Sequence, residues 1–120
     1  MKKKTLVLGA SENPDRYSYK AVKKLVQYGH PVVAVGRRKG SIDAVNIHAE
    51  PVQVQDIDTV TLYLNPQNQK PYYDYILSLK PKRILFNPGT ENRELEALAE
   101  ANHIATLQGC TLVLLSIGNY

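Results

Sequence analysis

Two short apolar runs separated by an amphipathic stretch constrain the fold of this chain most strongly. Residues 4–9 (KTLVLG) and 31–36 (PVVAVG) are continuously apolar, which predicts strands covered on both faces. Residues 17–28 change to a helical period, and the inward face of the predicted helix carries Ala21, Val22, Leu25 and Val26. Gly29 is expected to end this helix in the left-handed conformation. Strand, helix and strand together predict a right-handed βαβ unit with parallel strands.

The rest of the chain continues this alternation. The pattern predicts a short edge strand near Ile47, strands at residues 59–64, 83–87 and 104–107, and helices between the last three. Residues 110–117 (CTLVLLSI) form an apolar segment that could be strand or helix. We therefore expect an α/β fold: a single-domain, Rossmann-like, doubly wound and mostly parallel sheet with helices on both faces, spanning residues 1–120.

Capping residues predict where the later helices begin and end. Asn65 followed by Pro66 is typical of an N-cap and a first helical position. Thr90 is predicted to cap the next helix, which buries Leu98, and Asn102 is predicted to end that helix in the left-handed conformation.

The positive charge of the chain is concentrated near its beginning. The net charge is +4, but residues 1–40 hold ten Lys or Arg against two acidic residues, a balance of 10 − 2 = +8. Such asymmetry favours anionic ligands, either a phosphorylated cofactor or nucleic acid. A solvated basic surface is the alternative interpretation.

Composition indicates a soluble globular protein. With 43% hydrophobic and 22% charged residues, the chain is ordinary for this class. No run approaches the roughly 18 apolar residues of a membrane span, and we identify no signal peptide. Cys110 is the only cysteine, so an internal disulfide is excluded. We therefore expect a cytoplasmic protein with no membrane partner.

The turn after the first strand is a candidate phosphate site. Ligands of doubly wound sheets bind outside the carboxyl ends of the strands, where a helix N-terminus favours a diphosphate. Gly9 permits close approach, Ser11 offers a hydroxyl, and Arg16 adds a bidentate phosphate donor. The later glycines of G-x-G-x-x-G are missing, however, and Asn13-Pro14 stands in their region. A plain structural loop is the alternative.

The end of the second strand narrows the choice of nucleotide. An NAD-binding fold usually has Asp or Glu there to accept hydrogen bonds from ribose hydroxyls. This chain has Gly36-Arg37-Arg38-Lys39 instead, which favours a ribose that carries an additional phosphate. NADP carries such a group on its 2′ oxygen and coenzyme A (CoA) on its 3′ oxygen, so both are candidates. A solvated loop that discourages edge pairing is the other interpretation.

Several motifs together resemble the stand-alone CoA-binding domain family, whose Rossmann-like fold is related to the CoA-binding domain of the succinyl-CoA synthetase α subunit. The resemblance spans nearly the whole chain. It is carried by Gly9-Ala10-Ser11 with Asn13-Pro14 and Arg16, by Ser18-Tyr19, and by Pro88-Gly89-x-Glu91-Asn92.

The resemblance implies a CoA site at the carboxyl edge of the sheet. Residues 9–11 and Arg16 would face the diphosphate, and the loop after the second strand would hold the 3′-phosphate. Family members often carry an Asn-Pro-rich loop there, and this chain departs from that pattern. The candidate cofactor-binding residues are Gly9, Ala10, Ser11, Asn13, Pro14, Arg16, Ser18, Tyr19, Gly36, Arg37, Arg38, Lys39, Asn65, Pro66, Pro88 and Gly89.

The sequence favours a binding module over an enzyme. His30 and His103 precede strands, at the end of the sheet opposite the expected ligand, and no motif supplies a metal site. Cys110 is expected to be buried and unreactive. We expect a CoA or acyl-CoA binding protein that works, where chemistry follows, with a separate protein subunit. The alternative is an NADP(H)-binding oxidoreductase or redox sensor, and nucleic-acid binding ranks below both.

Overall fold

Strand order in the sheet reverses beside the first strand. The computed structural model describes residues 2–120, and in it seven strands form one sheet in the order β3-β4-β2-β1-β5-β6-β7. The strands are β1 (Thr5–Ala10), β2 (Val32–Gly36), β3 (Gly40–Ile42), β4 (Val45–His48), β5 (Thr59–Leu62), β6 (Arg83–Phe86) and β7 (Ala105–Gln108). All neighbouring pairs are parallel except β3 and β4. From β1 the chain runs to β2 and the hairpin on one side, and it then returns to β5 on the other side of β1. The switch point of the strand order therefore lies between β1 and β5.

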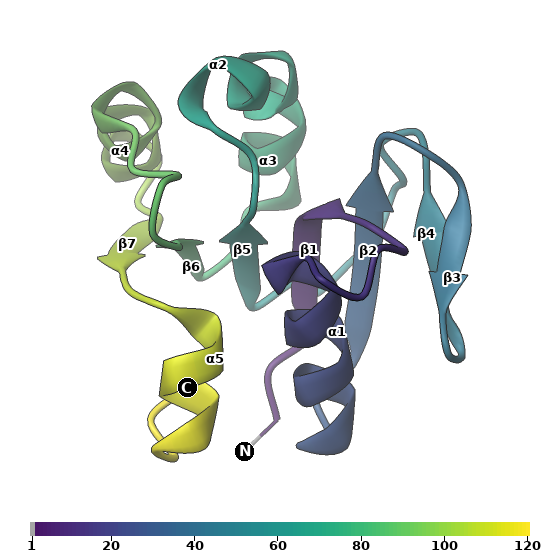
Figure 1. Cartoon of the computed structure of the whole chain (residues 1–120). Helices are drawn as coiled ribbons and strands as arrows, with labels where there is room; N and C mark the ends of the chain where they lie inside the picture. The colour runs from purple at the N-terminus through teal and green to yellow at the C-terminus, as the bar shows by residue number, and fades with distance from the viewer. Residues whose placement is uncertain (1) are drawn as a thin grey trace.

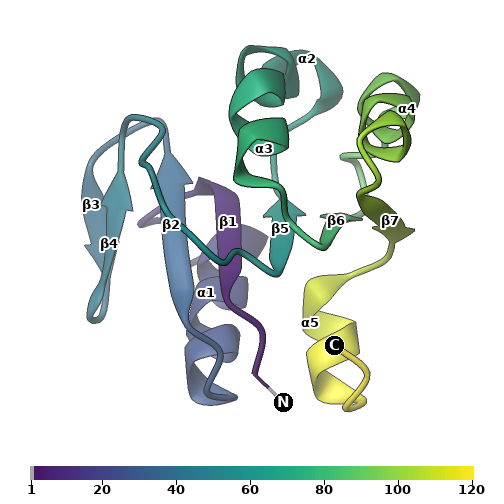
Figure 2. The ribbon, with the colours of Figure 1, turned by 180° about the vertical axis from the view of Figure 1, so that it is seen from behind.

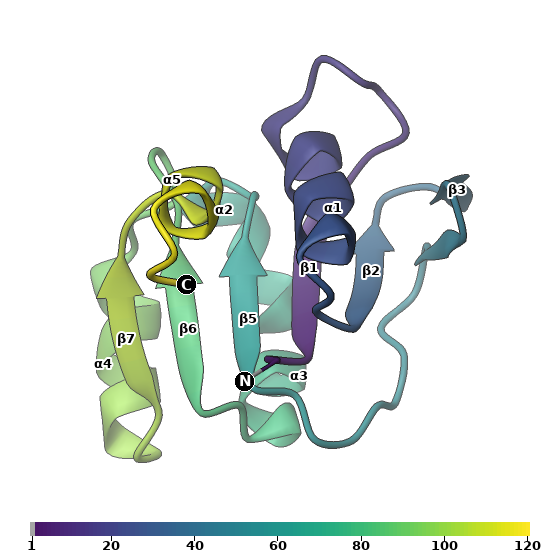
Figure 3. The same ribbon diagram turned by 90° about the horizontal axis from the view of Figure 1, so that it is seen from below.

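Helices cover both faces of this sheet. They are α1 (Tyr17–Gln27), α2 (Pro66–Gln69), a 3₁₀ turn η1 (Lys70–Tyr72), α3 (Tyr73–Leu79), α4 (Arg93–Ala101) and α5 (Thr111–Ser116). Helices α1 and α5 lie on one face, and α2, α3 and α4 lie on the other (Figures 1, 2 and 3). Two apolar clusters fill the spaces between the layers, one including Ile76 and Leu95 and the other Leu25 and Leu115. The predicted Rossmann-like fold is confirmed.

Helix α1 packs through one narrow face. Its buried residues are Ser18, Ala21, Val22 and Leu25. Gly29 has a φ of +84° and so ends the helix as predicted, with the His30 N–H donating to the Leu25 carbonyl at 3.0 Å. The prediction that Val26 faces inward is wrong, because it lies past the buried stripe and is 49% exposed.

The edge of the sheet near residue 47 differs from the prediction. Strand β4 contains Ile47, but β3 pairs with it in antiparallel orientation, so β3 is the edge strand. With only three residues, Gly40–Ile42 is too short to give a period-2 signal. The result is a β-hairpin beside β2, visible at the right of Figure 1.

The predicted N-cap is correct for α2 and wrong for α4. Asn65 caps α2 as predicted, accepting from the Asn68 N–H at 2.9 Å. For α4 the cap is Asn92 rather than Thr90, because the Asn92 Oδ1 accepts from the Glu94 and Leu95 N–H groups. The Thr90 hydroxyl instead donates to the Asn87 carbonyl.

The remaining predictions concern the end of α4 and the segment that follows β7. Asn102 has a φ of −105°, and His103, at +60°, takes the left-handed position after α4 in its place. Leu98 is only half-buried. Residues 111–116 form the helix α5, so the open choice between strand and helix is resolved. Among the described residues, no helix has the length and apolar character needed to cross a membrane.

Candidate functional site

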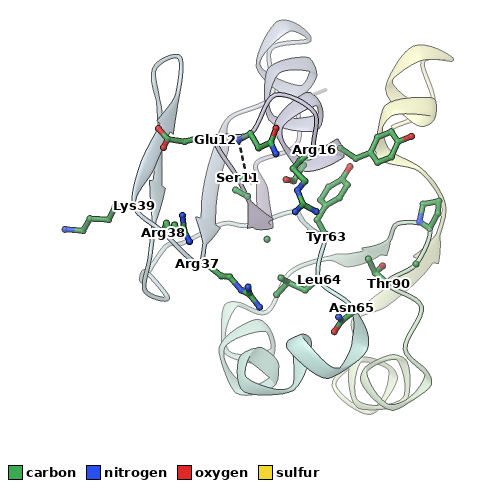
Figure 4. Close-up of a pocket in the computed structure, with 17 residues that line it drawn as sticks. Ser11, Glu12, Arg16, Arg37, Arg38, Lys39, Tyr63, Leu64, Asn65 and Thr90 are labelled. Carbon is green, nitrogen blue, oxygen red and sulfur yellow. Dashed lines mark hydrogen bonds between the residues drawn. The ribbon is translucent and has the colours of Figure 1, made fainter.

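A crevice of about 710 Å³ lies at the carboxyl ends of β1, β2, β5 and β6. Most of the predicted site residues line it: Gly9, Ala10, Ser11, Asn13, Arg16, Ser18, Arg37, Arg38, Lys39, Asn65, Pro88 and Gly89. They come from four separate segments that the parallel sheet brings to one edge (Figure 4). Pro14, Tyr19, Gly36 and Pro66 do not line the crevice. Tyr19 packs instead into the core cluster beneath α1.

Gly9 allows the first turn to pass close to the next strand. Its φ is +99°, a conformation that favours glycine, and a Cβ there would lie 3.0 Å from the Tyr63 carbonyl group. The turn that follows is shaped by its own side chains. The Ser11 Oγ accepts from the Asn13 N–H at 3.1 Å, and the Asn13 Oδ1 accepts from the Asp15 N–H at 3.0 Å. The Ser11 hydroxyl proton therefore remains free for a ligand.

The N-terminus of α1 is open. Arg16 occupies the N-cap position without a capping side-chain hydrogen bond, and the first turn contains no acidic residue. In contrast, asparagine side chains cap α2 and α4. The first N–H groups of a helix without such a cap keep their full capacity to bind an anion. Because Arg16 and Ser18 also line the crevice, this helix end matches the requirements of a phosphate.

The loop between β2 and β3 supplies cations to the same crevice. Arg37, Arg38 and Lys39 all line it, and none of them forms a salt bridge with a described residue. In Figure 4 the Arg37 side chain extends toward Leu64, across the crevice, whereas the Lys39 side chain extends outward from the hairpin. Arg37 is therefore the member of this loop best placed to meet a bound anion.

Gly36 sets the spacing behind this loop. A Cβ on Gly36 would lie 2.2 Å from the Ala10 carbonyl oxygen, a distance that no side chain tolerates. Gly36 therefore lets the ends of β1 and β2 approach each other, although it has no surface in the crevice itself.

Five lining residues were not predicted: Glu12, Tyr17, Tyr63, Leu64 and Thr90. Tyr63 and Leu64 were included in a strand at residues 59–64, but β5 ends at Leu62, so both residues belong to the loop at the crevice. The Tyr63 hydroxyl is buried with no hydrogen-bond partner among the described residues. Burial raises the pKa of this phenol well above its usual value, so it stays protonated.

Two buried amide side chains hold the far wall of the crevice in place. Asn87 donates to the Thr61 Oγ1 and to the Leu62 carbonyl at 2.7 and 2.8 Å, and it accepts from the Thr111 N–H at 2.9 Å. Gln69 is fully buried and donates to the carbonyl oxygens of Leu64 and Thr90, both at 2.8 Å. The loops after β5 and β6 are therefore fixed to each other before any ligand binds.

The histidines and the cysteine lie away from the crevice lining. His30 is buried at the opposite edge of the sheet, where its Nδ1 accepts from the Lys3 N–H at 2.9 Å. Cys110 is free and lies just before α5, and the prediction that it is buried is wrong because it is only half-buried. Across residues 2–120, no group of three His, Cys, Asp or Glu side chains is arranged to hold a metal ion.

Comparisons with known proteins give a family match and a closely similar structure. A family model described as a CoA binding domain matches residues 3–116. The crystal structure of an uncharacterized protein is 52% identical, with a TM-score of 0.97, over 100% of this chain and 99% of that one.

More distant structures share the fold. A hypothetical protein from Pyrococcus horikoshii OT3 is 23% identical with a TM-score of 0.84, over 93% of this chain and 80% of that one. Aspartate dehydrogenase from Thermotoga maritima is 18% identical with a TM-score of 0.57, over 100% of this chain and 53% of that one. No curated protein matches the chain.

Proposed function

The chain belongs to the CoA-binding domain family, and on that basis we propose that its crevice binds CoA or an acyl-CoA. The observation that carries the proposal is the pairing of two anion-binding features in one crevice. An uncapped helix N-terminus lies beside a glycine turn, and a cationic loop follows the second strand. A molecule with a diphosphate and a separate ribose phosphate has the charge pattern that such a crevice favours.

In this proposal the diphosphate lies on the turn between β1 and α1. The α1 N–H groups, the Ser11 hydroxyl and the Arg16 guanidinium are its donors. Gly9 leaves room for a phosphate close to the backbone, since it carries no Cβ.

The adenosine 3′-phosphate lies near the loop of residues 37–39. Arg37 extends into the crevice and supplies a planar, permanently charged donor. The other cations of the loop raise the local positive potential, whether or not each of them contacts the phosphate.

We propose that residues 1–120 act as one CoA-binding domain without catalytic machinery of its own. The crevice lining offers hydroxyl, amide and guanidinium groups that bind and orient a ligand. Where a reaction follows, a separate protein subunit supplies its catalytic groups. This binding role is compatible with free CoA and with an acyl-CoA thioester. We expect the ligand to come from the cytoplasmic CoA pool.

A ligand panel tests this proposal against the NADP(H) alternative. The purified protein is heated with CoA, dephospho-CoA, NADPH or NADH, and the unfolding temperature is measured. A ligand at about 100 times its dissociation constant adds roughly 2.7 kcal/mol of stability, which a thermal shift detects. We expect CoA to give the largest shift. A larger shift with NADPH would instead favour an NADP(H)-binding oxidoreductase or redox sensor.

A further inference from the structure

Glu12 is the one acidic side chain in the crevice lining, and its contacts differ from those expected of an anion among cations. Arg37, Arg38 and Lys39 line the same crevice, yet Glu12 forms no salt bridge with any described residue. Its Oε2 instead accepts a hydrogen bond from the backbone N–H of Ser41 at 2.9 Å. Figure 4 shows the side chain reaching from the first turn to the hairpin.

Ser41 lies on β3, the edge strand that begins directly after the cationic loop. An edge strand has backbone N–H groups without a strand partner, and the Glu12 carboxylate satisfies one of them. The contact joins residues 29 positions apart in the sequence. It therefore ties the turn proposed to hold the diphosphate to the loop proposed to hold the 3′-phosphate.

Gly40 leaves room for the Glu12 carboxylate because it has no Cβ. A Cβ on Gly40 would lie 2.3 Å from the Glu12 Cδ and 2.7 Å from its Oε1. The φ of Gly40 is outside the left-handed range, so the backbone itself accepts an alanine there. An alanine at this position would therefore displace the flexible Glu12 side chain and leave the backbone in place.

We propose that Glu12 is a positioning residue, which sets how strongly the crevice selects a ribose phosphate. The inference rests on the proposed CoA function and identifies a residue that positions part of the same site. By fixing the start of β3 against the first turn, Glu12 holds the 37–39 loop at the distance that two linked phosphate groups require. Because the carboxylate is engaged by a backbone N–H, it leaves the three cations free for the ligand.

A second tether of the hairpin provides a matched control. At the far end of the hairpin, the Lys23 Nζ lies 3.2 Å from the Asp43 Oδ2. Both side chains are largely exposed, and an exposed pair of this kind contributes little energy. Neither residue lines the crevice, so Lys23→Ala changes the hairpin without touching the proposed positioning contact.

The test is isothermal titration calorimetry of the whole protein with CoA and with dephospho-CoA. The quantity compared is the ratio of their two dissociation constants. In Glu12→Ala and in Gly40→Ala, we expect the preference for CoA to fall by about three- to tenfold, the range typical of losing one hydrogen bond. Affinity for dephospho-CoA stays within about twofold, since the diphosphate donors are intact.

Three further variants separate positioning from general damage. Glu12→Gln keeps an oxygen acceptor for the Ser41 N–H and should restore most of the preference for CoA. The double variant Glu12→Ala with Gly40→Ala should match Glu12→Ala alone, because the alanine at residue 40 then meets no side chain. Lys23→Ala should leave the ratio unchanged. Amide exchange at Ser41 provides a readout without ligand, and it should accelerate in Glu12→Ala.

The outcomes separate a failure of the proposed CoA function from a failure of the role proposed for Glu12. A wild-type protein that binds neither CoA nor dephospho-CoA would overturn the proposed function. Binding of the two ligands with equal affinity would leave CoA binding in place, but it would remove the 3′-phosphate role of residues 37–39 and overturn this inference with it. A wild-type preference for CoA that persists in Glu12→Ala and Gly40→Ala would overturn the inference alone. A gain of CoA affinity in Glu12→Ala would also overturn it, because repulsion of the phosphate would then be the main effect of the carboxylate.

Discussion

Gly36 is the residue with the least tolerance for a side chain in this fold. Its Cβ would lie 2.2 Å from the Ala10 carbonyl oxygen, so Gly36→Ala must separate the ends of β1 and β2. We expect a loss of about 1–3 kcal/mol in the free energy of unfolding, as in other overpacked sites. Urea unfolding measures it. Gly109→Ala is the control, because its Cβ would meet only ordinary contacts at 3.7 Å or more. Equal effects of the two changes would refute this account of Gly36.

His30 should make the stability of the protein depend on pH. Burial, reinforced by the charges of Lys2 and Lys3, lowers the pKa of His30 below its usual value of 6.5. The unfolded chain therefore binds a proton more readily than the folded one. The contribution of His30 is complete above about pH 6.5 and is lost as the pH falls toward the lowered folded value.

The measurement for His30 is the unfolding free energy between pH 5 and pH 8 for the wild type and for His30→Asn, at intervals of about 0.5 in pH. Asparagine offers an acceptor for the Lys3 N–H but does not titrate in this range. We expect the wild-type stability to fall more steeply on acidification than that of the variant. Parallel curves would contradict the role assigned to His30.

Individual residues of the crevice were predictable when a local signal marked them. Gly9, Arg16 and Arg37 were predicted because a glycine after a strand, or a cation before a helix or after a strand, is informative by itself. Glu12 was missed because its role depends on Ser41, which is distant in the sequence. A contact of this kind leaves no trace in local composition or periodicity.

At the scale of elements, Asn87 joins two strands to a helix. Its amide contacts Thr61 and Leu62 of β5, and it accepts from both the N–H and the hydroxyl of Thr111, the first residue of α5. Asn87→Ala removes the acceptor of the buried Thr111 N–H and a donor to the Leu62 carbonyl, whereas the Thr61 and Thr111 hydroxyls keep their contact with each other at 2.7 Å. Each buried group left unsatisfied costs about 1–3 kcal/mol.

We expect Asn87→Ala to lose about 2 kcal/mol or more of unfolding free energy by chemical denaturation, since two buried backbone groups are affected. Asn102→Ala is the control, because the Asn102 side chain makes one exposed hydrogen bond, to the Leu98 carbonyl. A loss at Asn87 no greater than at Asn102 would show that the network does not hold α5 in place.

The elements themselves were predicted best where packing imposes a period. Strands β1, β2, β5 and β6 are buried between two helical layers, and each was found within one or two residues of its observed bounds. Strand β4 was predicted as a short strand near Ile47, but β3, and with it the hairpin, was missed because β3 has only three residues. The cap of α4 was misassigned because Thr90 and Asn92 both have suitable side chains. Contacts distant in the sequence distinguish them: the Asn92 amide donates to the Gln69 and Tyr73 side chains, whereas the Thr90 hydroxyl donates to the Asn87 carbonyl.

At the scale of the whole molecule, part of the positive charge of residues 1–40 lies at the crevice. The cations Arg16, Arg37, Arg38 and Lys39 gather at the crevice, although they are separated in the sequence. Raising the salt concentration from about 0.1 M to 1 M shortens the Debye length from about 10 Å to about 3 Å. We therefore expect CoA affinity to fall with salt, and to fall more than dephospho-CoA affinity does. Calorimetry at both concentrations measures this, and salt-independent binding would contradict an electrostatic role for these residues.

CoA differs from dephospho-CoA by the 3′-phosphate, which we propose is bound near the loop of residues 37–39. Titration calorimetry of the wild-type protein at low salt, with CoA in one series and dephospho-CoA in the other, tests this proposal most directly. We predict that CoA binds about tenfold more tightly or better, a difference of at least about 1.4 kcal/mol. Indistinguishable dissociation constants would contradict the account, since residues 37–39 would then have no phosphate to recognise.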